Sequence, residues 1–256
     1  MRRLVLTALV SALVLGGCVG KATDKVEKKV PEETLQIVAA ASLKDAFADI
    51  AREFERENPG VKVSNVFDGS TTLVQQLSEG FKADVFASAD KKNMDKAVER
   101  GLVDDTASRV FATNQITAAV PAANPGQVKG LVDLAKRELK VVVCAPEVPC
   151  GNSTGKVLKK AGLQVTPVSQ EQNVKAVSTK LASGEADAGF IYRTDVKAAN
   201  GKITEIPTEV DADLLNKYPI AELKQAEHKK IARAFIKFVI GEKAQKILQG
   251  YGFGKP

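Results

Sequence analysis

Short apolar runs alternate with segments of helical spacing along the chain from residue 35 onward. Continuous or alternating apolar runs predict strands, and apolar residues at helical spacing predict helices with one buried face. The predicted strands are 35–40, 61–67, 83–87, 116–120, 139–145 and 186–192. The predicted helices are 43–58, 72–79, 94–100, 155–161, 171–183 and two segments within 228–249 that separate at Gly241. This alternation predicts an α/β fold with mainly parallel sheets.

The composition narrows the possible functions. A chain of 256 residues suits one large domain or two small lobes. The net charge of +6 comes without a basic helix or an aromatic platform, so no nucleic-acid partner is expected. With one histidine and three cysteines the chain lacks the material for a histidine-rich cation site, and no cofactor is expected. Recognition therefore depends on hydroxyls, backbone groups and charge.

The first residues have the features of an export signal. Two arginines follow Met1, and residues 4–17 carry no charge. A membrane-spanning helix needs about 20 apolar residues, so this shorter run predicts a signal peptide at 1–17. It ends in LGGC at 15–18, which resembles the bacterial lipobox and makes Cys18 the predicted lipidation site. The alternative is an ordinary secretory signal that happens to contain Cys18.

The segment after the signal predicts a tether. Residues 18–33 begin with the lipidated cysteine, and 19–33 contain four lysines, four acidic residues and few apolar ones. Such a composition cannot offset the conformational entropy lost on folding. We expect an exported protein that is held at the outer face of the cytoplasmic membrane by lipid, or that is periplasmic.

Small and hydroxyl residues gather at four junctions near predicted helix starts. They are AAASL at 39–43, DGSTTL at 68–73, PCGNSTG at 149–155 and SQEQNV at 169–174. Ligands of α/β sheets bind beyond the carboxyl ends of strands, where the first N–H groups of helices lack backbone partners. Each junction alone is typical of a helix cap. Together they predict a cleft of donors without a carboxylate or a fixed cation, which favours an anion that is fully ionised at neutral pH.

Three of these segments, at 39–43, 70–73 and 149–151, resemble the periplasmic molybdate-binding proteins of ABC transporters. The resemblance includes ADVFASAD at 83–90, GFIY at 189–192 and YGF at 251–253, and it extends in the same order from about residue 35 to the C-terminus. It implies a bilobal periplasmic-binding-protein-like fold with two mainly parallel sheets, flanking helices and a ligand cleft between the lobes. It also implies a monomer that is no enzyme, binds molybdate or tungstate with high affinity and delivers it to a membrane permease.

The resemblance further implies how the chain divides into lobes. Residues 34–114 and 219–256 would form the first lobe, and residues 115–218 the second. The two crossings would lie near 113–117 and 216–220.

The resemblance assigns five residues to the oxyanion. Ser42 and Ser70 would bind through their hydroxyls and backbone N–H groups, Tyr192 through its phenol, and Cys150 and Val174 through backbone N–H groups. Cys150 stands where the family more usually has alanine, but a backbone contact does not depend on the side chain. The alternative for Tyr192 is a buried hydroxyl that bonds only to a neighbouring group.

A second cysteine precedes Cys150 closely. Cys144 lies near the end of a predicted strand, and Pro146 and Pro149 stand between the two cysteines. In an exported protein such a pair predicts a disulfide. Two buried thiols or a redox-active pair are the alternatives, although the spacing is not that of C-x-x-C.

Other functions were weighed against the oxyanion receptor. One is a receptor for another tetrahedral oxyanion, such as sulfate. Another is an extracellular enzyme with Cys150 as nucleophile, for which His228 is the only imidazole base. Asp84, Asp90 and Asp187 lie near strand ends, where carboxylates could suggest acid–base catalysis, but we expect Asp84 and Asp187 to cap loops or brace the strands.

Overall fold

The computed structural model describes residues 33–208 and 214–256. The predicted signal peptide and Cys18 lie outside these residues. So does the predicted tether, apart from Glu33, which begins the first strand. Across the described ranges, no helix has both the length and the apolar character that a membrane crossing requires.

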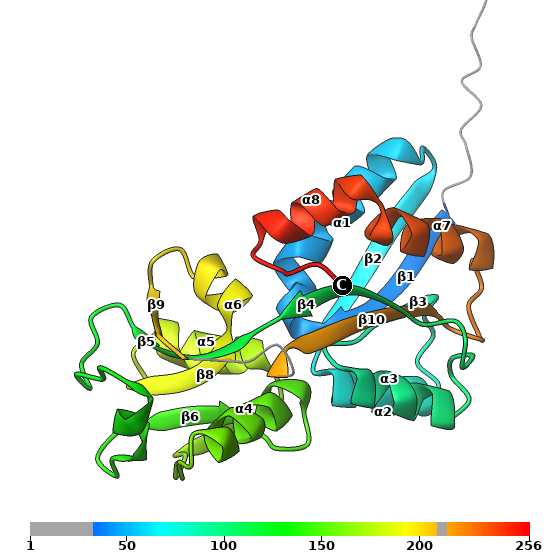
Figure 1. Cartoon of the computed structure of the whole chain (residues 1–256). Coiled ribbons are helices and arrows are strands. Elements are labelled where there is room, and N and C mark those ends of the chain that lie inside the picture. Colours follow the sequence, from blue (N-terminus) through cyan, green and yellow to red (C-terminus); the bar gives the residue numbers. More distant parts are fainter. Residues whose placement is uncertain (1–32, 209–213) are drawn as a thin grey trace, which may run out of the picture. The chain divides into compact units, whose positions relative to one another are not determined.

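The first sheet has five strands in the order β2-β1-β3-β10-β4 (Figure 1). Its strands are β1 (Glu33–Ala40), β2 (Val61–Asp68), β3 (Val85–Ala87), β4 (Arg109–Asn114) and β10 (Asn216–Glu222). β1 pairs in parallel with β2 and β3, whereas β10 runs antiparallel to β3 and β4. Segments from the beginning and the end of the described chain thus form one sheet.

Helices cover both faces of the first sheet. The group on one face is α1 (Lys44–Glu57), α7 (Lys229–Ile240) and α8 (Glu242–Gly250), and the group on the other is α2 (Ser70–Ser78) and α3 (Lys91–Glu99) (Figure 1). Phe47, Ile50 and Phe54 of α1 recur at helical spacing and are buried on one side of the helix. The Phe54 ring packs edge-on against Phe235 of α7, with 5.2 Å between ring centroids.

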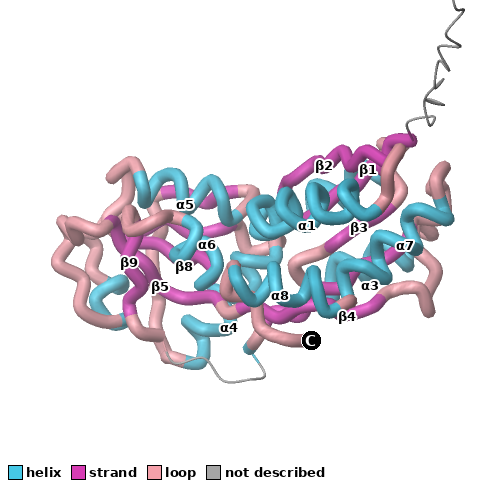
Figure 2. Tube along the Cα trace, turned by 90° about the horizontal axis from the view of Figure 1, so that it is seen from above, coloured by secondary structure: helices cyan, strands magenta, loops and turns pink. Residues whose placement is uncertain are grey.

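The second sheet also has five strands, in the order β7-β6-β8-β5-β9. Its strands are β5 (Ile116–Pro121), β6 (Val141–Cys144), β7 (Ser169–Glu171), β8 (Ala188–Tyr192) and β9 (Ile203–Ile206). Its helices are α4 (Pro149–Lys160), α5 (Val174–Ala182) and α6 (Arg193–Ala198). Of the short 3-10 helices, η1 (Ala41–Leu43) lies between β1 and α1, and η2 (Leu131–Ala135) lies between β5 and β6. Helices α4 and α5 lie on opposite sides of this sheet (Figure 2).

The predicted α/β class, with two sheets and flanking helices, is confirmed, but the sheets are mixed rather than mainly parallel. β6 runs parallel to β7 and β8, whereas β5 runs antiparallel to β8 and β9. β5 and β10, with which the chain enters the second sheet and returns to the first, are the strands that run antiparallel to their neighbours. The prediction did not include β4, β7, β9 or β10. β10 in particular contains Pro219, at a shift in its register with β4.

The second crossing precedes β10. Residues 216–218 pair with 112–114 of β4. These three residues, which the resemblance assigns to the second lobe, therefore belong to the first sheet. The division of the chain into two lobes stays a prediction.

Several helix starts differ from the prediction: α2 and α3 begin at Ser70 and Lys91 rather than at 72 and 94, and α4 and α5 differ as well. α4 begins at Pro149, earlier than the predicted 155, because proline is favoured in the first turn and Gly151 is held against the preceding loop. α5 begins at Val174 rather than 171, because Glu171 is still part of β7. The Asn173 side chain caps α5 by accepting the Ala176 N–H at 3.1 Å.

Candidate functional site: a buried cavity lined by both sheets' helix starts

The five residues assigned to the oxyanion line one small cavity. Ser42, Ser70, Cys150, Val174 and Tyr192 all contribute to its wall, and each is at most 6% exposed. The cavity measures about 20 Å³. Sites for drug-sized molecules measure roughly 300–1,000 Å³. The space therefore suits a ligand of very few atoms.

The N-terminal ends of helices that flank both sheets meet at this cavity. Ser42 lies in η1, Ser70 begins α2, Cys150 is in the first turn of α4 and Val174 begins α5. The first N–H groups of a helix have no partner within the helix, and the helix dipole adds partial positive charge there. The cavity thus gathers donors and positive potential, which is the environment that an anion prefers.

The Ser70 hydroxyl is oriented by the backbone of Ala89. The Ala89 N–H donates to Ser70 Oγ at 3.0 Å, and both residues line the cavity. A serine hydroxyl carries a single hydrogen, and the bond from Ala89 uses only the oxygen. The Ser70 hydrogen therefore stays available for donation.

The Ser42 hydroxyl is oriented by a tyrosine of the first sheet. Ser42 Oγ lies 2.9 Å from the Tyr218 hydroxyl, and that hydroxyl accepts the Asn114 side-chain amide at 3.3 Å. Tyr218 is fully buried, and burial raises its pKa above the ordinary value. It is therefore a neutral phenol at physiological pH.

Tyr192 ends β8 at the cavity wall and is 1% exposed. Its hydroxyl oxygen accepts the Asn216 side-chain amide at 3.0 Å. Burial raises the pKa of Tyr192 well above its ordinary value, so the phenol keeps its hydrogen. The alternative of a bond to a neighbouring group is therefore present, and the assignment of Tyr192 to the oxyanion stays a prediction.

The predicted disulfide between Cys144 and Cys150 is confirmed. It joins the end of β6 to the first turn of α4, next to Gly151, where a Cβ would overlap the Ala145 carbonyl. Only glycine permits this close approach. Because both sulfurs are bonded to each other, Cys150 has no thiolate, and the alternative of a cysteine nucleophile is excluded.

The cavity wall also contains polar residues of the predicted junctions that were not assigned to the oxyanion. Asp68 corrects the expectation that no carboxylate would be present. Its Oδ1 accepts the Gly69 N–H at 2.7 Å and the Asn173 side-chain amide at 3.0 Å. Since Asp68 ends β2 and Asn173 caps α5, the second bond joins the two sheets.

Two more contacts join the sheets beside the cavity. The Thr71 hydroxyl donates to the Glu147 carbonyl at 3.0 Å. Gly69 lies so close to Gln172 that a Cβ would overlap the Gln172 carbonyl. The wall is therefore built by backbone segments from both sheets in direct contact.

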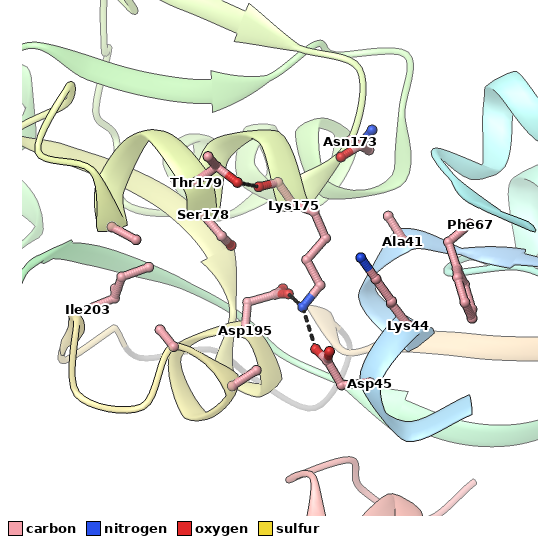
Figure 3. A pocket seen from close by; sticks show the side chains of 13 residues that line it. Ala41, Lys44, Asp45, Phe67, Asn173, Lys175, Ser178, Thr179, Asp195 and Ile203 are labelled. Atoms are coloured by element: carbon pink, nitrogen blue, oxygen red, sulfur yellow. Dashed lines mark hydrogen bonds and ion pairs between the residues drawn. The ribbon is translucent and has the colours of Figure 1, made fainter. Parts of the chain in front are cut away.

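A larger groove of about 560 Å³ lies beside the cavity and contains an ion cluster (Figure 3). Lys175 of α5 places its ammonium 2.8 Å from Asp45 of α1 and 3.1 Å from Asp195 of α6. Burial raises the pKa of Asp195, and Lys175 opposes that rise. Burial also disfavours the charge on Lys175, but the two carboxylates outweigh it and raise its pKa. The groove contains none of the five assigned residues.

Asp84 and Asp187 brace the backbone, as predicted, and Asp90 caps the start of α3. Asp84, Asp90 and Asp187 accept backbone N–H groups at 2.8–2.9 Å. The described part of the chain contains no group of three or more His, Cys, Asp or Glu residues placed to hold a metal ion. These carboxylates therefore have structural partners already.

Residues 35–254 match the family model described as "Bacterial extracellular solute-binding protein". The chain belongs to this family. Relatives named molybdate-binding protein ModA confirm the resemblance drawn from the motifs. That of Mycobacterium tuberculosis is 38% identical over 98% of this chain and 97% of its own. The putative ABC transporter substrate-binding lipoprotein YvgL of Bacillus subtilis is 31% identical over 97% of this chain and 96% of its own.

Solved structures of solute-binding proteins share the fold. The periplasmic molybdate-binding protein of Azotobacter vinelandii has a TM-score of 0.74 at 23% identity, covering 87% of this chain and 99% of its own. The sulfate-binding protein SubI of M. tuberculosis has the same TM-score at 17% identity, covering 87% of this chain and 86% of its own. Membership of this family assigns the chain a binding role rather than an enzymatic one.

Proposed function

We propose that this solute-binding protein binds molybdate outside the cytoplasm and delivers it to the permease of an ABC transporter. The observation that carries the proposal is the convergence of helix starts and oriented hydroxyls from both sheets on one small buried cavity. Molybdate at neutral pH is a dianion whose four oxygens only accept hydrogen bonds, so it matches a wall of donors. The identity of 38% to M. tuberculosis ModA supports the same ligand.

Each assigned residue has a role in this proposal. Ser42 and Ser70 donate through hydroxyl and backbone N–H, Tyr192 donates its phenol hydrogen, and Cys150 and Val174 donate backbone N–H groups. Donors that are already held in place lose little freedom on binding, so affinity is high. Tungstate has the same tetrahedral shape and charge, and we expect it to bind as well.

Closure of two lobes on the ligand is part of the proposal. One lobe would be residues 34–114 with 216–256, since 216–218 pair with β4, and the other would lie between them. The contact between Asp68 and Asn173 supports closure, because it joins the sheets at the cavity wall. The closed form would be the one that the permease recognises.

Attachment by lipid at Cys18 completes the proposal. The B. subtilis relative named as a lipoprotein supports it. Metabolic labelling with palmitate tests it: the wild-type protein should incorporate label and Cys18→Ala should not. Label on the Cys18→Ala protein would reject the anchor.

A thermal-shift panel of molybdate, tungstate, sulfate and phosphate tests the ligand. A ligand at 100 times its Kd adds about 2.7 kcal/mol to the free energy of unfolding, which is readily visible as a rise in Tm. Molybdate and tungstate should raise Tm, and sulfate and phosphate should not. A response to sulfate alone would favour the other oxyanion receptor, and no response to molybdate would reject the proposal.

A further inference from the structure

Two buried asparagines lie opposite each other on the strands by which the chain leaves and re-enters the first sheet. Asn114 ends β4, Asn216 begins β10, and the two are paired in register. They are 3% and 6% exposed. Asn114 donates its amide to the Tyr218 hydroxyl at 3.3 Å, and Asn216 donates to the Tyr192 hydroxyl at 3.0 Å. Neither asparagine lines the cavity itself.

The orientation of each amide is fixed by the backbone. Asn114 Oδ1 accepts the Gln115 N–H at 2.9 Å, so its Nδ2 must be the end that faces Tyr218. Asn216 Nδ2 also donates to the Ala89 carbonyl at 3.0 Å. A backbone N–H only donates and a carbonyl only accepts, so turning either amide over would bring like groups together and leave them unpaired.

The fixed amides set the direction of the hydroxyls beyond them. Ser42 Oγ and the Tyr218 hydroxyl lie 2.9 Å apart and either can donate; the Asn114 amide takes one acceptor position of the Tyr218 oxygen and favours the arrangement in which the Tyr218 hydrogen points to Ser42 Oγ. The Ser42 oxygen then acts as acceptor, and its own hydrogen is left for the cavity. Asn216 likewise donates to the Tyr192 oxygen, so the phenol hydrogen is the group with which Tyr192 would meet the oxyanion.

We propose that Asn114 and Asn216 are positioning residues, which hold the hydroxyls of Ser42 and Tyr192 as donors toward the bound oxyanion. The inference rests on the proposed function and names the residues that make the cavity wall a donor to a fully deprotonated ligand. Neither asparagine touches the ligand. Asn114 acts through Tyr218, and Asn216 acts through Tyr192.

A double-mutant cycle on Asn114 and Tyr218 tests this relay. Asn114→Asp keeps the shape of the side chain but replaces the donor by an acceptor, which draws the Tyr218 hydrogen away from Ser42. Ser42 then donates to Tyr218 and turns its oxygen toward the ligand. We expect the affinity for molybdate, measured by calorimetry, to fall about 10- to 100-fold, the range for losing one hydrogen bond to a charged group.

The Tyr218→Phe background separates the relay from other effects of the new carboxylate. Without the Tyr218 hydroxyl, Ser42 is free to donate to the ligand whatever residue 114 is. Asn114→Asp should therefore cost at least about fivefold less affinity in this background than in the wild type. The repulsion between the carboxylate and the oxyanion is present in both backgrounds, so the comparison removes it.

Equal losses of affinity in the two backgrounds would overturn the inference and leave the proposed function standing. A wild-type protein that does not bind molybdate would instead reject the proposed function, and the inference with it. Thermal unfolding of every variant is measured in parallel. If Asn114→Asp does not fold, the same cycle is run with Asn114→Leu, which removes the donor without adding charge.

Discussion

The Lys175 ammonium lies 2.8 Å from the Asp45 carboxylate, which joins α5 on the second sheet to α1 on the first. The same ammonium lies 3.1 Å from Asp195, whose side chain is buried. Lys175 directly follows Val174, which lines the cavity. The ion pair therefore holds helices of the two sheets together directly beside Val174, whose backbone N–H is assigned to the oxyanion.

Replacing Lys175 should weaken ligand binding. Lys175→Met removes the ion pair between the sheets but keeps the length of the side chain. A partly exposed ion pair contributes about 1 kcal/mol, so the affinity for molybdate should fall roughly fivefold. Lys180→Met is the matched control, because Lys180 lies on the same helix and pairs with Glu171 at 2.5 Å within the second sheet's part of the chain. Equal losses for both variants would contradict a role for the bond between the sheets.

The same cluster predicts how stability depends on pH. The pKa of Asp195 is raised in the folded protein, so between its ordinary value of 3.8 and the folded value the folded state binds more protons than the unfolded state. The free energy of unfolding should therefore fall as pH rises through this window. Lys175→Met removes the positive charge that limits the rise of the Asp195 pKa. In this variant the fall in the free energy of unfolding should therefore extend to higher pH.

Denaturant unfolding at a series of pH values checks this shift. Asp195→Asn, added to Lys175→Met, supplies a neutral side chain of the same shape and should abolish the additional pH dependence. An unchanged pH profile in Lys175→Met would show that Lys175 does not control the protonation of Asp195.

Gly69 should be intolerant of any side chain. A Cβ at this position would overlap the Gln172 carbonyl of the facing segment. Gly69→Ala should therefore reduce the affinity for molybdate at least about tenfold, because a backbone shift of this kind misplaces donors on both sides of the cavity. Gly155→Ala is the control: no atom lies within 4 Å of its Cβ, and alanine in a helix should stabilise the fold by about 0.5–1 kcal/mol. If Gly69→Ala bound molybdate as tightly as the wild type, the close contact between Gly69 and the Gln172 carbonyl would not be needed for binding, and the prediction would be wrong.

The disulfide should stabilise the loop that leads into α4. Cys144 and Cys150 are separated by 6 positions, and closing so short a loop contributes about 2 kcal/mol in the chain-entropy account. Reductant should lower Tm of the wild type and leave the Cys144→Ala/Cys150→Ala variant unchanged. Thiol titration of denatured protein should show two more thiols after reduction than before. An equal thiol count would contradict the bond.

Local sequence patterns predicted the helices and strands whose own residues mark a buried face. Phe47, Ile50 and Phe54 mark α1 because their spacing places them on one helix face. The start of α4 was wrong because it depends on Gly151 fitting against the Ala145 carbonyl, which no local pattern encodes. β10 was missed because its Pro219 disfavours a strand until pairing with β4 absorbs the register shift.

The residues of the candidate site also fall into two groups, those that a local motif indicates and those that only the folded chain brings together. Ser42 and Ser70 stand in short motifs at helix starts and were found through them and the family resemblance. Asn114 and Asn216 carry no local signal, since they meet only when β10 pairs with β4. Asp68 stands in a predicted junction, but its bond to Asn173, which places a carboxylate in the wall, is visible only in the folded chain.

Calorimetric titration with molybdate tests the central claim most directly. The wild type should bind one molybdate per chain, and Ser42→Ala/Ser70→Ala should bind at least about 100-fold more weakly, because two hydrogen bonds to a charged ligand are lost. Ser78 lies on the same helix as Ser70, and its hydroxyl donates to the Val74 carbonyl at 2.7 Å. The control variant Ser78→Ala should therefore keep wild-type affinity. Absence of molybdate binding by the wild type, or unchanged affinity in the double variant, would contradict the account.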